Sequence, residues 1–377
     1  MNNKSRLVIF NIIFVILNFG FWNRTPLLSQ TTTTSAGHAL GSWVDRTASQ
    51  TNSPTAGEDV ALIYDPRSHR IILFGGKDDE NQNSNEVWTF DLTKNLWEQI
   101  NINGAAPPAS EDHSLIYDPL GYRVILFGGE DGPTWNNTWS FDLTTFRWSD
   151  LTDSTAPKRE DHTAIYDSRG KRMVVFGGQE NDDLSNEIWT FDLDPASTAG
   201  DKWQKLTIED EQPLARYDHA AVYDSANNRM IIYGGWDENE ERYLDDTWTF
   251  YFEHFSWRQL RTKKSYPPKR RHAVGVLDSA RNWFIIQGGF GEEGYLNDVW
   301  AFDLEANTWL NITPGPQPRI DHSAIYDPKT QRMILFGGDA GLQSKFRDLW
   351  ELRIQPDLPL DELLKEAGAK RQRREAN

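Results

Sequence analysis

A short polar segment that could carry chemistry recurs along the chain. Its copies read Ser110-Glu111-Asp112-His113, Arg159-Glu160-Asp161-His162, Arg216-Tyr217-Asp218-His219, Arg270-Arg271-His272-Ala273 and Arg319-Ile320-Asp321-His322. The arginines Arg159, Arg216, Arg270 and Arg319 share one position, and His272 stands where the other copies carry Asp. Because guanidinium groups bind carboxylates through paired hydrogen bonds, four such arginines could bind an anion or an acidic sugar.

The same segment allows two other interpretations. Carboxyl and imidazole groups can transfer protons, which makes Glu111, Glu160, Asp161 and His162 acid–base candidates. They can also bind a metal, but equivalent positions around a ring are too far apart for ligand distances of ~2 Å, so we expect no metal or cofactor. The simplest interpretation is structural, since residues that recur in most copies would form hydrogen bonds between repeats.

Aromatic side chains in acidic stretches form a second set of candidates. They are Trp135, Trp236, Tyr243, Phe290 and Tyr295, and none of them occupies a repeated position. Exposed aromatic rings beside polar groups stack on carbohydrates and form the hot spots of protein interfaces. We therefore predict that Trp135, Trp236, Tyr243 and Tyr295 contact a ligand, together with the four arginines and His272.

The elements that position these residues are themselves repeated. Gly-Gly pairs occur six times, at 75–76, 128–129, 177–178, 234–235, 288–289 and 337–338. Each pair follows an apolar run such as Ile71-Ile72-Leu73-Phe74 and precedes a Trp, the first being Trp88. A turn with Asp followed by Pro or Ser comes before each run, and five of these turns carry an Arg five residues after the Asp. These signals predict four short strands, A to D, in every unit, with the Asp and Arg paired across the A–B hairpin.

This pattern resembles the kelch repeat, whose units of about 50 residues form the four-stranded blades of a β-propeller related to the central domain of galactose oxidase. The resemblance implies an all-β fold with six blades, in which Trp side chains fill the gaps between blades. The last unit lacks a second Trp, so we expect the N-terminal strand around Trp43 to complete it and close the ring. Arg46 departs from the pattern, because other D strands have Leu or Ile there. Strand A is innermost in a propeller, which would place the arginines around the mouth of the central channel, beside the B–C loops.

Composition and the chain ends limit the function classes. The 377 residues carry a net charge of −17, which disfavours nucleic-acid binding, and the absence of Cys excludes disulfides and the Cys–Tyr copper site of galactose oxidase. Lys4 and Arg6 precede the apolar stretch 7–22, which predicts a secretory signal or an uncleaved membrane anchor. We expect a signal at 1–30, a polar linker at 31–40, the propeller at 41–354 and a charged tail at 355–377 with a short helix.

These observations favour a secreted, periplasmic or cell-surface monomer that binds a protein or a glycan through the face carrying the D–A and B–C loops. Membrane attachment would require an uncleaved N-terminal segment. The alternative is a carbohydrate-acting enzyme, such as a mutarotase or lyase on acidic sugars, that uses the arginines. The sequence contains no paired-carboxylate or nucleophile motif that stands out from the repeats, so the binding interpretation is preferred over catalysis.

Overall fold

The computed structural model describes residues 40–47, 52–181, 183–197, 202–262, 266–341 and 345–355. The predicted signal at 1–30 and the predicted helix of the tail lie outside these residues. None of the described segments forms a helix long and apolar enough to span a bilayer.

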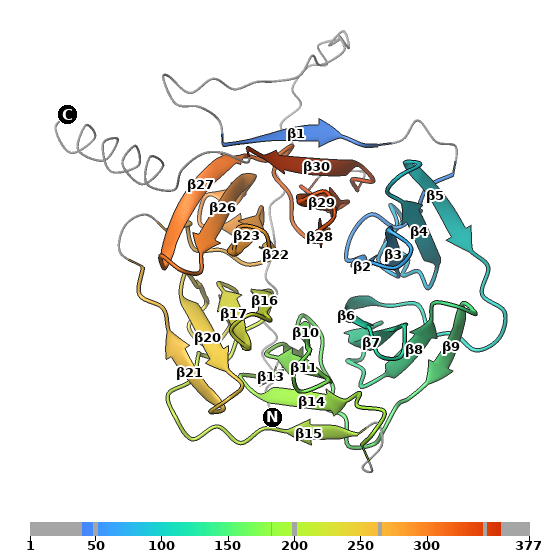
Figure 1. Ribbon diagram of the computed structural model, residues 1–377, viewed down its shortest axis with the longest axis horizontal. Coiled ribbons are helices and arrows are strands. Elements are labelled where there is room, and N and C mark those ends of the chain that lie inside the picture. The colour runs from blue at the N-terminus through green and yellow to red at the C-terminus, as the bar shows by residue number, and fades with distance from the viewer. Residues whose placement is uncertain are drawn as a thin grey trace, which may run out of the picture. The chain divides into compact units, whose positions relative to one another are not determined.

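The described strands form six antiparallel four-stranded sheets around a central channel (Figure 1). Blade 1 comprises β2 (Ala61–Asp65), β3 (Arg70–Phe74), β4 (Val87–Asp91) and β5 (Leu96–Ile100). Blade 2 comprises β6 (Glu111–Asp118), β7 (Arg123–Glu130), β8 (Thr138–Asp142) and β9 (Arg147–Asp150). Blade 3 comprises β10 (Thr163–Asp167), β11 (Arg172–Phe176), β14 (Ile188–Asp192) and β15 (Trp203–Lys205).

The second half of the ring repeats this order of strands. Blade 4 comprises β16 (Ala220–Asp224), β17 (Arg229–Tyr233), β20 (Thr247–Tyr251) and β21 (Ser256–Gln259). Blade 5 comprises β22 (Val274–Asp278), β23 (Trp283–Gln287), β26 (Asp298–Asp303) and β27 (Thr308–Pro314). Blade 6 comprises β28 (Ser323–Asp327), β29 (Arg332–Phe336), β30 (Leu349–Ile354) and, from the start of the chain, β1 (Gly41–Asp45). The prediction of a six-bladed all-β propeller is confirmed.

The ring closes where the two ends of the propeller meet. Strand β1 pairs antiparallel with β30, with Trp43 opposite Leu352, as the N-terminal strand was expected to do (Figure 1). The backbone N–H of Arg46 makes the hydrogen bond of this strand position, because it donates to the Leu349 carbonyl at 2.7 Å. The Arg46 guanidinium lies 3.7 Å from the Glu351 carboxylate. The ion pair explains how Arg replaces the usual Leu or Ile. Closure leaves β30 without a free edge, which would otherwise invite aggregation.

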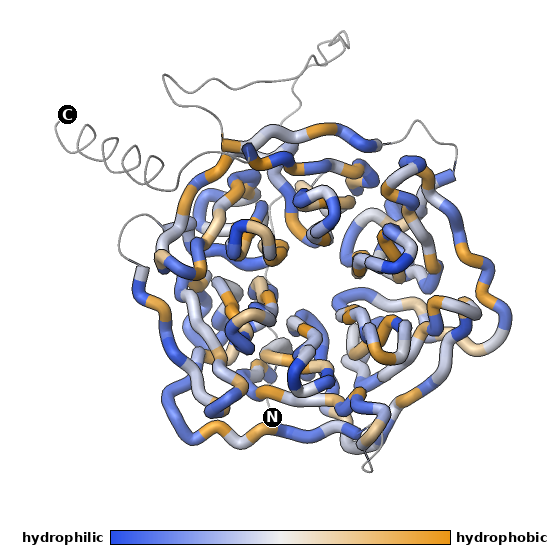
Figure 2. The backbone as a smooth tube through the Cα atoms, in the orientation of Figure 1, coloured by the Kyte–Doolittle hydropathy of each residue, from blue (hydrophilic) through white to orange (hydrophobic). Residues whose placement is uncertain are grey.

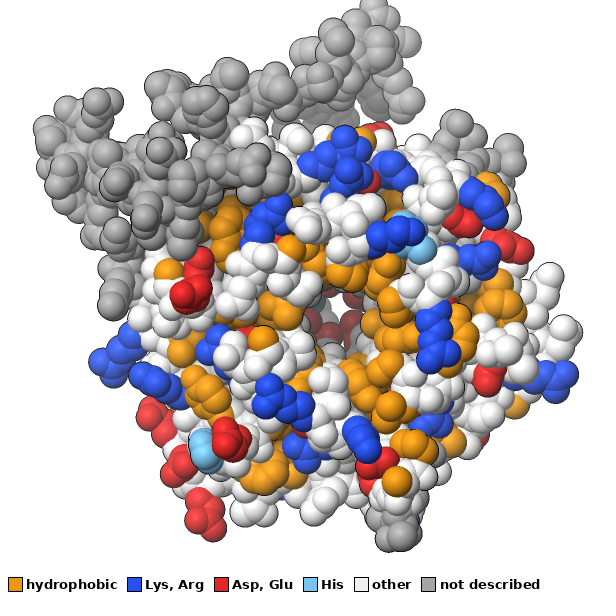
Figure 3. Space-filling view, viewed as in Figure 1, with side chains coloured by type: hydrophobic (Ala, Val, Ile, Leu, Met, Phe, Trp, Pro, Cys, Tyr) orange, Lys and Arg blue, Asp and Glu red, His pale blue; other side chains and the backbone are white. Residues whose placement is uncertain are grey.

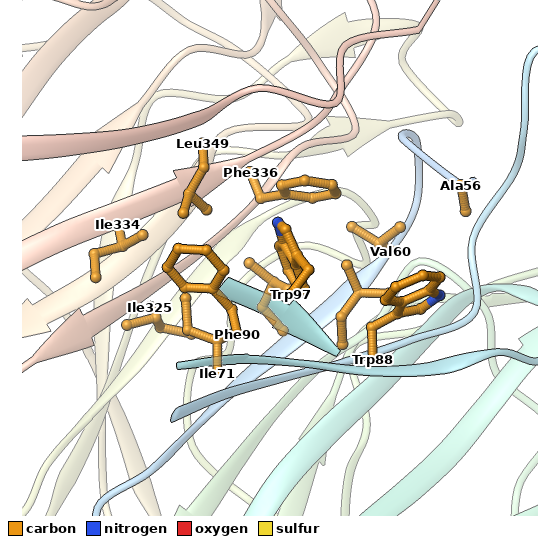
Figure 4. Packing of buried hydrophobic residues seen from close by; sticks show 12 residues of the cluster. Ala56, Val60, Ile71, Trp88, Phe90, Trp97, Ile325, Ile334, Phe336 and Leu349 are labelled. Atoms are coloured by element: carbon orange, nitrogen blue, oxygen red, sulfur yellow. The ribbon is translucent and has the colours of Figure 1, made fainter. Parts of the chain in front are cut away.

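Aromatic side chains fill the seams between blades. In blades 1 to 5 the second Trp contacts the last aromatic residue of strand B in the preceding blade, as Trp97 does with Phe336 at 5.2 Å between ring centroids (Figure 4). Trp148 and Phe74 make the same contact at 5.1 Å. The predicted role of these Trp residues is confirmed. Hydrophobic residues concentrate in the strands, whereas the outer connections are mainly hydrophilic (Figure 2).

The Gly-Gly pairs bring each blade close to the next one. In blade 2, Gly128 and Gly129 have φ of +70° and +93°, values that favour glycine. The Gly129 N–H donates to the Arg159 carbonyl of blade 3 at 2.9 Å, and a Cβ on Gly128 would collide with that same carbonyl. The glycines are therefore required by the close approach of two backbones.

The predicted Asp–Arg pairs of the A–B hairpins form in three blades. Their Nε–carboxylate distances are 2.8 Å for Arg123–Asp118, 2.9 Å for Arg172–Asp167 and 2.8 Å for Arg229–Asp224. In blade 6 the expected pairing is wrong, because Arg332 binds Glu351 at 2.6 Å instead. Glu351 belongs to the neighbouring strand β30, and only the folded sheet brings it within reach.

Candidate functional site

Six equivalent residues surround the channel mouth where each blade begins. This mouth ring consists of Asp59, Asp112, Asp161, Asp218, His272 and Asp321, and it lines a cavity of about 280 Å³. All six have left-handed backbones with φ between +52° and +54°. Asp and His tolerate this conformation better than most side chains do, which explains why these types recur. Acidic side chains are visible deep inside the central opening in the view of Figure 3.

Backbone hydrogen bonds connect neighbouring members of the mouth ring. The Asp161 N–H donates to the Asp112 carbonyl at 3.3 Å, the Asp218 N–H to Asp161 at 3.2 Å and the His272 N–H to Asp218 at 2.9 Å. Across the closure, the Asp59 N–H donates to the Asp321 carbonyl at 3.0 Å. These bonds join the blades at the mouth, and the left-handed backbone gives the recurrence of Asp a structural cause, in line with the simplest interpretation of the sequence.

His272 is the one imidazole of the mouth ring, and it bridges two carboxylates. Its Nε2 lies 2.9 Å from Asp218 and its Nδ1 lies 2.6 Å from Asp321. Burial opposes the imidazolium charge, but these two carboxylates outweigh it and raise the pKa of His272 well above its ordinary value. The two carboxylates therefore favour the charged imidazolium form of His272. The predicted alignment of His272 with the Asp position is correct.

The other side of the mouth ring has an excess of carboxyl groups. Burial and the neighbouring carboxylates raise the pKa of Asp59, Asp112 and Asp161 well above the usual range. Glu58 and Glu111 flank these residues, and ligand atoms of the groups Glu58–Asp59–Asp321 and Asp59–Glu111–Asp112 lie within 4.8 Å of one another. Lysine ammonium groups already occupy both clusters, because Lys345 pairs with Glu58 and Lys77 pairs with Glu111. We therefore assign no metal to them.

The histidines that follow the mouth ring belong to the seams between blades. His162 Nε2 lies 2.7 Å from Ser114 Oγ, and His219 Nε2 lies 2.7 Å from Thr163 Oγ1, each across one seam. Burial lowers the pKa of His113 to about 4 and that of His162 to about 3, so both are neutral at physiological pH. Their recurrence reflects contact between blades, and the acid–base role considered for His162 has no support in its surroundings.

The four arginines lie elsewhere than the sequence analysis expected. They do not line the channel cavity. The side chain of Arg216 is fully buried, and its guanidinium binds both Asp246 oxygens at 2.6 and 2.9 Å and the Gly234 carbonyl at 2.9 Å. Trp248 Nε1 donates to the same Asp246 at 2.7 Å.

The same ion pair between an arginine and the acidic residue two positions before the first Trp, which we call the clamp, recurs in other blades. Arg270 binds Asp298, Arg319 binds Asp348 and Arg159 binds Glu187, with shortest distances of 2.6, 2.7 and 2.9 Å. In each case the acid stands two residues before the first Trp of the blade, a sequence signal that could have revealed the pairing. An arginine whose donors are already bound inside the blade is not free for an external anion. Their binding role stays a prediction, and the geometry argues against it.

Short hairpins beside the mouth, which we call platforms, place three of the predicted aromatic residues close together. The B–C connections of blades 4 and 5 fold into the hairpins β18 (Trp236–Asp237) with β19 (Arg242–Tyr243), and β24 (Phe290–Gly291) with β25 (Gly294–Tyr295). Trp236 pairs with Tyr243 and Phe290 with Tyr295 across these hairpins. Ring centroids lie 4.6 Å apart in the first pair, 5.0 Å in the second, and 6.2 Å between Tyr243 and Phe290.

Tyr217 and Arg271 belong to the same surface and were not selected from the sequence. Tyr217 forms an antiparallel β-bridge with Trp236, and Arg271 forms one with Phe290, so both residues lie directly beside the hairpins. The Arg271 guanidinium lies 5.3 Å from the Trp236 ring centroid and 5.9 Å from that of Tyr217. We call Tyr217, Trp236, Tyr243, Phe290 and Tyr295 the aromatic arc. All five are half-buried and thus partly accessible to a partner.

Trp135 lies on another blade. It is in the B–C connection of blade 2, where its backbone N–H donates to the Gly129 carbonyl at 2.9 Å and its carbonyl accepts from the backbone N–H of Arg159 at 3.0 Å. The structure therefore brings together Trp236, Tyr243 and Tyr295 but does not place Trp135 in the aromatic arc.

This geometry defines a closed propeller whose blades are held by repeated clamps and whose mouth carries the irregular residues. The KLHDC2/KLHL20/DRC7 Kelch-repeats domain matches residues 39–197, 120–314 and 196–355. The chain therefore belongs to the kelch-repeat family.

Several curated proteins are similar over the propeller. Kelch domain-containing protein 3 of Homo sapiens is 27% identical over 275 residues, which cover 68% of this chain and 66% of that protein. The flagellar outer-arm dynein alpha chain of Chlamydomonas reinhardtii is 25% identical over 286 residues, 69% of this chain and 5% of that protein. Adagio protein 3 of Arabidopsis thaliana is 30% identical over 165 residues, 42% of this chain and 25% of that protein. This chain thus spans less than two thirds of the length of these relatives.

Proposed function

We propose that this kelch propeller is a protein-binding module and that its partner contacts the face carrying the D–A and B–C connections. The observation that carries the proposal is the aromatic arc. The equivalent platform pairs of the first three blades are polar or mixed: Lys77 with Asn83, Glu130 with Thr134, and Gln179 with Leu184. Trp and Tyr at such positions are therefore not demanded by the blade, and they are the residue types that dominate binding energy at interfaces.

The test is a binding experiment with surface variants. Trp236→Ala and Tyr295→Ala should each weaken capture of the partner by the purified protein at least tenfold, since hot-spot truncations cost about 2 kcal/mol or more. Phe255→Ala is the matched control, because Phe255 is an exposed aromatic residue in the β20–β21 turn of blade 4, away from the aromatic arc. Equal losses for Phe255→Ala, or no loss for either arc variant, would contradict the proposed face. A glycan array run in parallel would reveal a carbohydrate ligand instead.

We also propose that the chain is exported. Lys4 and Arg6 followed by the apolar stretch 7–22 support this, because a charged start and an apolar core are what the secretion machinery recognises. Replacing two residues of the apolar stretch, Ile12 and Val15, by Asp should retain the protein inside the expressing cell. Unchanged export of that variant would exclude the segment as the signal.

A further inference from the structure

The platforms around the mouth differ in chemistry from one half of the ring to the other. Blades 1 to 3 carry an acidic arc, which consists of Glu58, Glu111, Glu130 and Glu160. Blades 4 and 5 carry the aromatic arc at the equivalent positions. The mouth ring, with five Asp and one His, lies between the two arcs. The repeat explains why a platform exists in each blade, but it does not explain this division.

The aromatic arc is held in a fixed arrangement. Glu238 accepts hydrogen bonds from Trp236 Nε1 at 2.6 Å and from the Tyr217 hydroxyl at 3.2 Å. Arg271 donates to the same hydroxyl at 3.1 Å and lies 4.0 Å from Asp218. Rigid rings lose little conformational entropy on binding, so the arc is prepared for contact with apolar or cationic side chains.

Two carboxyl groups of the acidic arc have no ion-pair partner in the described part of the chain, and Lys77, which pairs with Glu111, is the cation that acts on Glu130 from nearby. Glu58 and Glu111 have lysine partners, but among the described residues no Lys, Arg or His forms an ion pair with Glu130 or Glu160. Thr134 Oγ1 donates to Glu160 at 3.1 Å, which satisfies part of that carboxyl without balancing its charge. Burial and Glu130 together raise the pKa of Glu160 to about 7. Glu130 is half-buried and so remains open to a partner, whereas Glu160 is buried.

These two arcs are complementary to one kind of partner. A Lys or Arg side chain would supply the ion-pair partner that Glu130 and Glu160 lack, whereas an acidic peptide, a phosphate group or a nucleic acid would be repelled by the mouth ring. The cavity of about 280 Å³ is lined by the mouth ring and by neither arc, and it is smaller than the ~300–1,000 Å³ of small-molecule pockets. Apolar residues next to the cation would then lie over the aromatic arc.

We infer that the mouth of this propeller binds a basic, apolar segment of a partner protein, with a Lys or Arg directed at the acidic arc and its apolar neighbours on the aromatic arc. The inference rests on the proposed protein-binding function and adds the chemistry of the partner.

A random peptide display selection against the purified full-length chain tests the inference. We expect the selected peptides to be enriched in Lys or Arg next to aromatic or branched apolar residues. For a selected peptide, Glu130→Gln and Trp236→Ala should each weaken binding about tenfold. Raising the salt from about 50 to about 500 mM should weaken binding to the unchanged protein, because it screens exposed charges. Glu98→Gln is the matched control, since Glu98 is an exposed carboxylate on the outer strand β5.

The outcomes separate this inference from the proposed function. Selection of acidic or neutral peptides that still depend on Trp236 would overturn the partner chemistry and leave the binding face in place. Equal affinity of Glu130→Gln and Glu98→Gln would also overturn it. Binding that survives Trp236→Ala but not Glu130→Gln would overturn the proposed contact with the aromatic arc. Unchanged thermal midpoints of the variants would show that each loss reflects contact and not unfolding.

Discussion

The clamp formed by Arg216 offers the most direct test of how this propeller is held together. Arg216→Ala removes a guanidinium that is fully buried and leaves Asp246 with Trp248 Nε1 as its remaining side-chain partner in the clamp. Burial opposes ionisation of Asp246, but Arg216 outweighs it and lowers the pKa of that carboxyl. Without Arg216 the half-buried carboxylate of Asp246 has no cation within the described segments to compensate its charge. We therefore expect a loss of stability and not a loss of a ligand site.

The expected magnitude follows from the geometry. Removing one partner of a buried ion pair costs about 3–5 kcal/mol. The propeller spans about 310 residues from Gly41 to Ile354. At about 2.1 cal/mol/K per residue, its unfolding entropy is roughly 0.65 kcal/mol/K, so the midpoint should fall by about 5–8 °C.

The assay is Trp-fluorescence unfolding by heat and urea, with Arg258→Ala as the control. Arg258 lies exposed on the outer strand β21, and its removal should change the stability by less than about 0.5 kcal/mol. Asp246→Asn should destabilise as well, and the double variant should lose less than the sum of the two single variants, because both act on one pair. A fall of less than about 2 °C for Arg216→Ala, or strict additivity, would refute the clamp and restore Arg216 as a ligand-binding candidate.

Three further predictions concern closure, pH and backbone. Deleting 40–47 removes β1 and exposes the edge of blade 6, so the protein should elute as aggregates in size-exclusion chromatography; a stable monomer would show that the ring does not need this strand. Because the folded pKa of Glu160 is about 7, above its unfolded value, the folded state binds more protons between about pH 4.5 and 7 and stability falls as pH rises through that window. Glu160→Gln should remove this pH dependence, which amounts to at most ~3 kcal/mol across the window, in urea titrations while Glu98→Gln retains it, and parallel curves for both would contradict the assignment. Gly128→Ala places a Cβ against the Arg159 carbonyl at a φ of +70°, and it should lower the thermal midpoint by several degrees; a neutral effect would mean that the seam can shift.

Much of the fold follows from local sequence signals. Strand patterns, Asp turns and Gly-Gly pairs act within a few residues of one another, so the amino-acid order alone predicts the four strands of each blade. The missing second Trp of the last unit predicts closure by Trp43, and β1 pairs with β30 as expected. The position of His272 in the Asp series is also predictable, because the repeats align and each demands a residue that tolerates a left-handed backbone.

The sequence did not indicate which carboxylate each arginine side chain would bind. Arg216 is 30 residues from Asp246, and the free energy of a buried guanidinium depends on which carboxylate the fold places beside it. The sequence suggested an open ring of arginines, whereas the structure turns each one into its own blade. Arg332 shows the same effect, since its partner Glu351 comes from the adjacent strand and not from its own hairpin.

The sequence by itself determined the repeat, the number of blades and the aromatic residues that no blade requires. Tertiary structure decided which of these residues share a surface. Blades 4 and 5 are neighbours in the ring, so Trp236, Tyr243 and Tyr295 gather in one arc with Tyr217 and Phe290, whereas Trp135 lies on blade 2. The reason is that hydrogen-bonding periodicity is local, but the neighbours of a side chain on the propeller face are set by the packing of blades around the channel.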